Sequence, residues 1–206
     1  MELKDKTKPM KGHFKIETFK NNKLIDSWEE HNLITEQSRL HFMKILSGMY
    51  YENKYINAFK LGTRGVYEET KDGVLTQYDN IPKDDASGFN DTRTDLFCNT
   101  KAETQNIDWA GISFTPSGDI NTSAASNVTD GANNDSTVDI YITTDGDPTL
   151  TYIFNISNSA FNGATEYTKY NEAGLYAEDT LIAMRTFKSK AKDSETSMRI
   201  TWAISF

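Results

Sequence analysis

The sequence has one cysteine, Cys98, among 206 residues, and it has no long apolar run. A single cysteine cannot form an intrachain disulfide, so a disulfide framework is excluded. No apolar stretch approaches the roughly 20 residues of a transmembrane helix. The first residues, Met1 to Lys6, also lack the apolar segment of a signal peptide. These absences predict a soluble protein that is made in the cytoplasm.

Basic residues are scarce: 22 Lys and Arg stand against 30 Asp and Glu, which gives a formal net charge of -8. Sequence-independent binding to nucleic acid needs clustered Lys and Arg that neutralise phosphates. The two basic runs, 4–11 and 188–192, are short, and we expect a solvated arm and a hairpin turn there. The charge therefore argues against nucleic acid and against anionic membranes as partners.

The motifs of common catalytic and metal sites are also missing. The three histidines, His13, His31 and His41, lie far apart with no His-x₃-His pair and no cysteine beside them. Gly-x-Ser-x-Gly, Gly-x-Gly-x-x-Gly, the phosphate loop and His-Glu-x-x-His do not occur. We therefore expect no catalytic residues, no cofactor-binding residues and no metal ligands, and we predict that the protein is not an enzyme.

Acidic residues cluster at three places: Asp84 with Asp85, Asp145 with Asp147, and 133–135. None of them has the spacing of an EF-hand loop, and solvated turns are the simpler interpretation. Calcium binding at such a turn remains an alternative. A pair of carboxylates that hydrolyses glycosides remains another, because Asp and Glu are plentiful.

What the sequence does have is the pattern of a packed, strand-rich domain. Its residues are 37% hydrophobic and 12% aromatic, and its length suits a single domain over 1–206. Residues 13–20 alternate between polar and apolar side chains, and 23–28 follow after Asn21 and Asn22. Because asparagine tolerates positive φ, this pattern predicts a β-hairpin.

One segment, 36–47, has the pattern of a helix. Leu40, Met43 and Leu46 recur at helical spacing and predict the buried face. Thr35 stands at the N-cap position, and Gly48 stands where a helix commonly ends. We expect this helix to cover one face of a sheet.

The other strand patterns are clearest in the last third of the chain. They lie at 55–62, 107–115, 138–143, 149–156, 172–177, 181–187 and 197–206. Short turns between the later strands favour antiparallel pairing. With the first hairpin and the helix, they predict a mainly β fold, an antiparallel β-sandwich with one α-helix packed on it in the first third of the chain.

The final strand pattern has one apolar parity. Met198, Ile200, Trp202, Ile204 and Phe206 share it, so we expect these side chains to face the core. Coverage of Phe206 by the protein itself is the preferred interpretation, and coverage by a neighbouring subunit is the alternative.

Three polar stretches predict long irregular segments. Residues 1–11 read as an N-terminal arm, and 63–106 and 116–137 read as loop excursions. Tyrosines are frequent in the chain and offer either an interface or a sugar-stacking surface. The set that we considered is Tyr50, Tyr51, Tyr55, Tyr67, Tyr78, Tyr167 and Tyr170.

Two groups of motifs resemble those of small structural virion proteins of tailed bacteriophages. The first is Glu-His-Asn-Leu-Ile-Thr-Glu-Gln-Ser-Arg at 30–39, followed by the helix and by Ile-Asn-Ala-Phe-Lys-Leu-Gly-Thr at 56–63. The second joins Glu-Ala-Gly-Leu-Tyr at 172–176, Leu-Ile-Ala-Met-Arg-Thr-Phe at 181–187 and Ile-Thr-Trp-Ala-Ile-Ser-Phe at 200–206. Both groups occur in the order that is typical of the family.

The resemblance implies a non-enzymatic structural component of a bacteriophage particle. Such a protein would be made in the host cytoplasm and would join the virion. It would form a homo-oligomer, and its other partners would be virion structural proteins. Ser38 and Arg64 stand where family members have glycine, so the resemblance leaves the subtype open among tail-collar, neck, baseplate and fibre-anchoring proteins. A capsid decoration protein and a module that binds host glycans are the alternatives.

Overall fold

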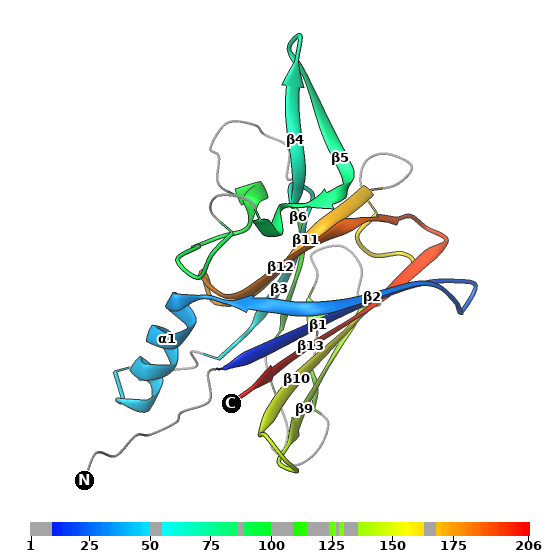
Figure 1. The fold of residues 1–206 in the computed structure, drawn as a ribbon. Helices are drawn as coiled ribbons and strands as arrows, with labels where there is room; N and C mark the ends of the chain where they lie inside the picture. Colours follow the sequence, from blue (N-terminus) through cyan, green and yellow to red (C-terminus); the bar gives the residue numbers. More distant parts are fainter. Residues whose placement is uncertain are drawn as a thin grey trace.

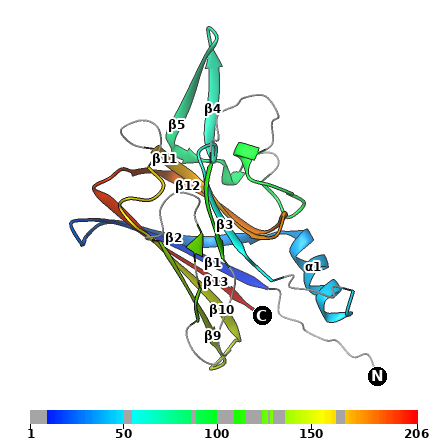
Figure 2. The same ribbon diagram turned by 180° about the vertical axis from the view of Figure 1, so that it is seen from behind.

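One long antiparallel sheet dominates the structure, a computed structural model that describes residues 10–49, 55–85, 89–99, 109–114, 124–126, 128–129, 136–162 and 168–206. The sheet curls into a nearly closed barrel, with one helix at its edge and a hairpin projecting from it (Figures 1 and 2). The predicted mainly β class with antiparallel strands and one N-terminal helix is confirmed.

The first half of the sheet contains six strands in the spatial order β7, β9, β10, β13, β1 and β2. Their bounds are Ala124–Ser126 (β7), Thr137–Thr143 (β9), Thr149–Ile156 (β10), Thr196–Ser205 (β13), Lys11–Lys20 (β1) and Lys23–Ile34 (β2). Asn21 and Asn22 join β1 to β2 with φ of 51° and 60°, which confirms the predicted hairpin.

The second half continues with five strands in the order β12, β11, β3, β6 and β8. Their bounds are Thr180–Lys192 (β12), Thr168–Ala177 (β11), Ala58–Gly62 (β3), Trp109–Phe114 (β6) and Val128–Thr129 (β8). The halves meet where β2 pairs with β12, with Leu33 opposite Met184 and Ile34 opposite Ala183.

The two layers of the expected sandwich are therefore the two halves of one continuous sheet, which face each other across a shared core. Phe59 of β3 stacks on Phe154 of β10, with ring centroids 4.3 Å apart. Trp202 lies edge-on to Phe14 at 4.9 Å, and both side chains are fully buried. On β13, Met198, Ile200, Trp202 and Ile204 are at most 2% exposed, which confirms the predicted inward parity.

Beyond their two paired residues, β2 and β12 are joined by side chains instead of backbone hydrogen bonds. The ring of Trp28 on β2 lies 6.1 Å from that of Phe187 on β12. Nearer the β1–β2 turn, Lys190 forms an ion pair with Asp26. This seam joins the two halves of the sheet without a full strand pairing.

The helix α1 spans Glu36–Leu46, as the sequence predicts. The Thr35 hydroxyl oxygen accepts a hydrogen bond from the Ser38 N–H at 3.2 Å, so Thr35 is the N-cap. Gly48 has φ of 70° just beyond the helix, where a residue with a Cβ would be strained.

The segment 63–106 contains more structure than the predicted surface loop. Strands β4 (Val66–Lys71) and β5 (Val74–Pro82) form the projecting hairpin, and short 3₁₀ turns follow at Lys83–Asp85 and Phe97–Asn99. Leu96 is fully buried in a small second core with Tyr176. The loop prediction was wrong here because this segment covers the outer face of β11 and β12.

Two other predictions concern loops. The lysine run 188–192 is not a turn, because β12 continues through Lys192 and the turn lies at 193–195. Most of the predicted 116–137 excursion falls outside the described residues, which include from it only the short strands β7 and β8, Ser136 and the first residue of β9.

Candidate functional site

The start of α1 is anchored to the second half of the sheet. The Thr35 hydroxyl donates a hydrogen bond to the Leu181 carbonyl of β12 at 2.6 Å, and the Thr35 N–H donates to Ile182 at 3.1 Å. Thr35 and Ser38 are fully buried against this strand. The helix is therefore held at its first turn by polar contacts, and its small polar side faces the sheet.

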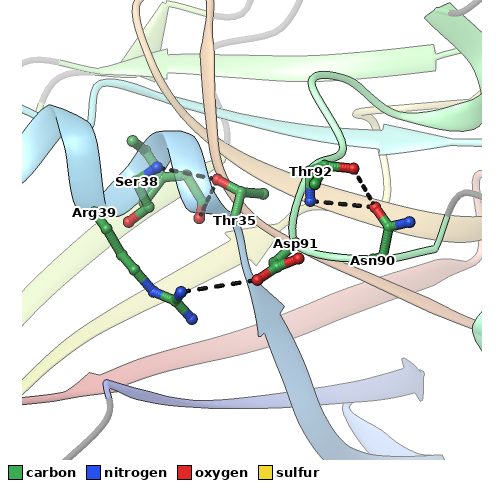
Figure 3. Close-up of polar contacts among 7 residues, drawn as sticks. Thr35, Ser38, Arg39, Asn90, Asp91 and Thr92 are labelled. Atoms are coloured by element: carbon green, nitrogen blue, oxygen red, sulfur yellow. Dashed lines mark hydrogen bonds and ion pairs between the residues drawn. The ribbon is translucent and has the colours of Figure 1, made fainter.

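A tight turn at residues 90–92 braces the same helix end (Figure 3). The Asn90 side-chain oxygen accepts hydrogen bonds from the Thr92 N–H and hydroxyl, at 3.2 and 2.6 Å. The Asp91 carbonyl accepts from the Glu36 N–H at 2.6 Å, and its carboxylate lies 3.7 Å from the Arg39 guanidinium. Both partners of this ion pair are about half exposed, so its contribution to stability is small.

The apolar side of α1 points away from the sheet, contrary to the prediction that it is buried. Leu40, Met43, Leu46 and Met49 are 51%, 65%, 87% and 69% exposed, and we call these four residues the α1 stripe. The periodicity of the helix was predicted correctly, but its orientation was not. Buried Ser38 and His41 take the sheet-facing positions instead.

A groove borders the stripe. It has a volume of about 470 Å³ and lies between the first two turns of α1 and the braced turn, with Leu40 and Met43 on one side and Thr92 on the other. Its polar rim comes from Glu36, Gln37 and Arg39. An apolar stripe beside a groove with a polar rim is the arrangement of a protein–protein contact surface.

The C-terminal residue lies beside the same helix. The ring of Phe206 is 5.8 Å from that of Phe42 on α1, and the Phe206 N–H donates to the Pro148 carbonyl at 2.9 Å. Phe206 nevertheless keeps 45% of its surface exposed, unlike the core residues before it. The protein covers this ring only in part, so the expectation that it faces the core was wrong.

The structure separates the other residues considered from the sequence. His13 and His31 face each other on β1 and β2 with ring centroids 6.5 Å apart, whereas His41 is buried in α1. Among the described residues, no three His, Cys, Asp or Glu side chains lie close enough to hold a metal ion.

The acidic clusters differ from one another. Asp84 is not a solvated turn residue, because it binds the Arg185 guanidinium and the Thr186 hydroxyl of β12. Asp145 and Asp147 lie in the exposed turn between β9 and β10, as expected. The third cluster, 133–135, is outside the described residues.

The tyrosines do not gather on one surface within the described residues. Tyr170 is buried and its hydroxyl donates to the Phe161 carbonyl at 2.9 Å. Tyr78 is 37% exposed and bonds to Glu69 on the projecting hairpin. Tyr50, Tyr51 and Tyr167 lie outside the described residues.

A buried carboxylate, which no sequence pattern predicts, fixes the second core. Glu172 of β11 is fully buried, and its carboxylate accepts hydrogen bonds from the N–H groups of Phe97, Cys98 and Arg64 at 2.7, 2.9 and 3.2 Å. Burial raises the pKa of Glu172, and the three N–H donors oppose that shift. Its bonding positions are used to hold two connecting segments on the sheet.

Comparison with known proteins gives no match, either to a protein family, to a curated protein or to a solved structure. No helix within the described ranges is long and apolar enough to cross a membrane.

Proposed function

We propose that this protein is a non-enzymatic structural component of a bacteriophage particle, an oligomeric tail, neck-collar or baseplate accessory or a fibre-anchoring protein. The α1 stripe carries the proposal. Three large apolar side chains on one exposed helix face, with Met49 just beyond the helix, are a liability for an isolated protein and suit a subunit that buries them in an assembly.

The packing of the family-like motifs supports the same proposal. These motifs are far apart in the sequence, but β3 pairs with β11, β11 with β12, and β12 with the end of β2. Residues 30–39, 56–63 and 172–187 thus form one continuous patch of sheet that carries α1. The remaining motif, 200–206, falls mostly on β13, which β1 separates from this patch in the strand order.

Two buried ionisable groups, Glu172 and Lys192, have structural partners, which supports a role without catalysis. The Glu172 carboxylate binds three backbone N–H groups. The Lys192 ammonium binds the carbonyl oxygens of Asn158 and Asp193 and the side-chain oxygen of Asn162. Groups engaged in this way hold the chain in place.

Quantitative mass spectrometry of purified phage particles tests this function. We expect the protein in intact particles, in a copy number that is a fixed multiple set by the symmetry of its ring or fibre. Particles that contain none of it would overturn the proposal. Cross-linking in the same particles separates tail, neck and baseplate neighbours from the alternative, a capsid decoration protein.

A further inference from the structure

A polar groove crosses the end of the barrel formed by the β1–β2 turn, the end of β10 and the β12–β13 turn. Its main part has a volume of about 750 Å³, and it continues into a smaller hollow of about 320 Å³ that shares Asn22, Ser157 and Ser197. We call this combined hollow the amide groove. Its lining is mainly polar and includes Asn22, Asn158, Ser194 and Ser197.

The walls of the amide groove are rigid turns. Asn21 and Asn22 both have positive φ, which fixes a tight two-residue hairpin turn. On the facing wall, the Asp193 carboxylate accepts from the Glu195 N–H at 2.9 Å, and the Asp193 N–H donates to the Thr196 hydroxyl at 3.0 Å. Because these walls are already ordered, binding of a ligand costs less conformational entropy.

A buried lysine links two of these walls through hydrogen bonds. Lys192 is fully buried, and its ammonium donates to the Asn158 carbonyl at 3.2 Å and to the Asp193 carbonyl at 2.8 Å. A third bond, to the Asn162 side-chain oxygen, is 2.8 Å long. One cation thus links the segment after β10 to the β12–β13 turn, which fixes the width of the groove.

Two of the charged groups in the groove pair with each other, and a third is held by a ring and an amide. Lys20 forms an ion pair with Glu195 across it. The Arg199 guanidinium lies 5.6 Å from the centre of the Phe19 ring and donates to the Asn155 side-chain oxygen at 3.3 Å. The charges of Lys20 and Glu195 therefore offset each other, whereas the Arg199 guanidinium is held in place by uncharged partners.

Its free bonding capacity lies in amides and hydroxyls. Within the described part of the chain, the side chains of Asn22, Asn158 and Ser194 form no hydrogen bond to the protein, and neither does that of Ser197. Each of these groups both donates and accepts hydrogen bonds. A set of such groups around a groove matches the hydroxyls of a sugar, each of which also donates and accepts.

We propose that the amide groove binds a neutral oligosaccharide. The opening is large enough for a short run of sugar rings, because small-molecule sites are typically about 300–1,000 Å³. The Lys20 ammonium is engaged by Glu195, and the amides and hydroxyls that remain are uncharged, so the groove suits a neutral glycan. This inference goes beyond the proposed structural role and does not depend on it. A virion protein that binds no glycan and a glycan-binding protein outside a particle would give different results in the two experiments.

A glycan array printed with neutral and acidic oligosaccharides tests the proposal on the full-length protein. We expect binding to neutral glycans, and then a loss of at least tenfold in affinity for the best of them in the double variant Asn158→Ala/Ser194→Ala. Both side chains are exposed, so the variant should melt at the native temperature. Thr144→Ala, in the exposed turn between β9 and β10, is the matched control and should bind as the native protein does.

Three results would overturn the proposal. The first is no binding to any printed glycan, and the second is binding to acidic glycans alone. The third is neutral-glycan binding that the double variant leaves unchanged, because the ligand would then lie elsewhere. Particle mass spectrometry is unaffected by each of these results, so a failure here leaves the structural role to be tested separately.

Discussion

At the scale of single residues, the contact between Gly12 and Asn32 explains why position 12 has no side chain. They lie opposite each other on β2 and β1, and a Cβ on Gly12 would be only 1.8 Å from the Asn32 side-chain oxygen. Asn32 is 9% exposed, and within the described residues its amide oxygen and nitrogen have no hydrogen-bond partner. The glycine makes room for an amide whose burial lowers stability.

Replacing Asn32 by leucine, which has a similar branched shape, should raise the free energy of unfolding by about 1–2 kcal/mol, because it removes two unpaired buried polar atoms. Chemical denaturation measures the change. Gly12→Ala is the companion variant and should lower stability, since its methyl group collides with Asn32. A leucine variant less stable than the native protein would indicate that the amide has a partner in solution.

The stability contribution of Lys192 should depend on pH. Burial lowers the pKa of this lysine from 10.5 to about 8. Between these two values the unfolded chain binds more protons than the folded one, so stability rises with pH in this window. Relative to Lys192→Met, the unfolding free energy of the native protein should rise between pH 8 and 9.5, by at most about 1.4 kcal/mol per pH unit. A flat or falling difference would contradict this assignment.

At the scale of elements, the features set by residues close together in the sequence were predicted correctly. The two asparagines fix the β1–β2 hairpin, Thr35 and Gly48 bound α1, and alternation predicts β13. Each of these signals comes from neighbours along the chain, so the sequence alone contains it.

Contacts between distant segments could not be predicted in this way. An apolar stripe has the same spacing whether a sheet or a partner covers it, so the orientation of α1 had no signal in the sequence. The bonds from Glu172 to residues 97 and 98 join segments that are separated by a large part of the chain. Only the fold brings the turns of the amide groove together.

Deleting Ser205 and Phe206 tests how the last strand ends. Ile204 is the last fully buried residue, whereas Phe206 is half exposed against Phe42. The Ser205 hydroxyl also bonds to that of Thr149 at 2.9 Å. The shortened protein should fold and stay soluble, with a loss of about 1–3 kcal/mol in unfolding free energy. Loss of soluble protein would mean that these two residues complete the core.

At the scale of the whole molecule, the two ends of the barrel differ in chemistry. The α1 stripe and Phe206 present apolar surface at one end, while the amide groove at the β1–β2 turn is polar, with exposed Leu24 and Ile25 on the strand beside it. In Figure 1 the helix and the β1–β2 turn lie on opposite sides of the molecule. Such polarity suits a subunit that binds its assembly partners at one end and keeps the other accessible.

The central claim is that this chain assembles through the α1 stripe, and light scattering coupled to size-exclusion chromatography tests it most directly. We expect the native protein to have the mass of a closed homo-oligomer and Met43→Glu/Leu46→Glu to be a folded monomer, because buried glutamates would disrupt the contact. The control Leu24→Glu/Ile25→Glu changes exposed apolar residues near the β1–β2 turn and should stay oligomeric. A monomeric native protein, or a stripe variant that keeps the native mass, would contradict the account.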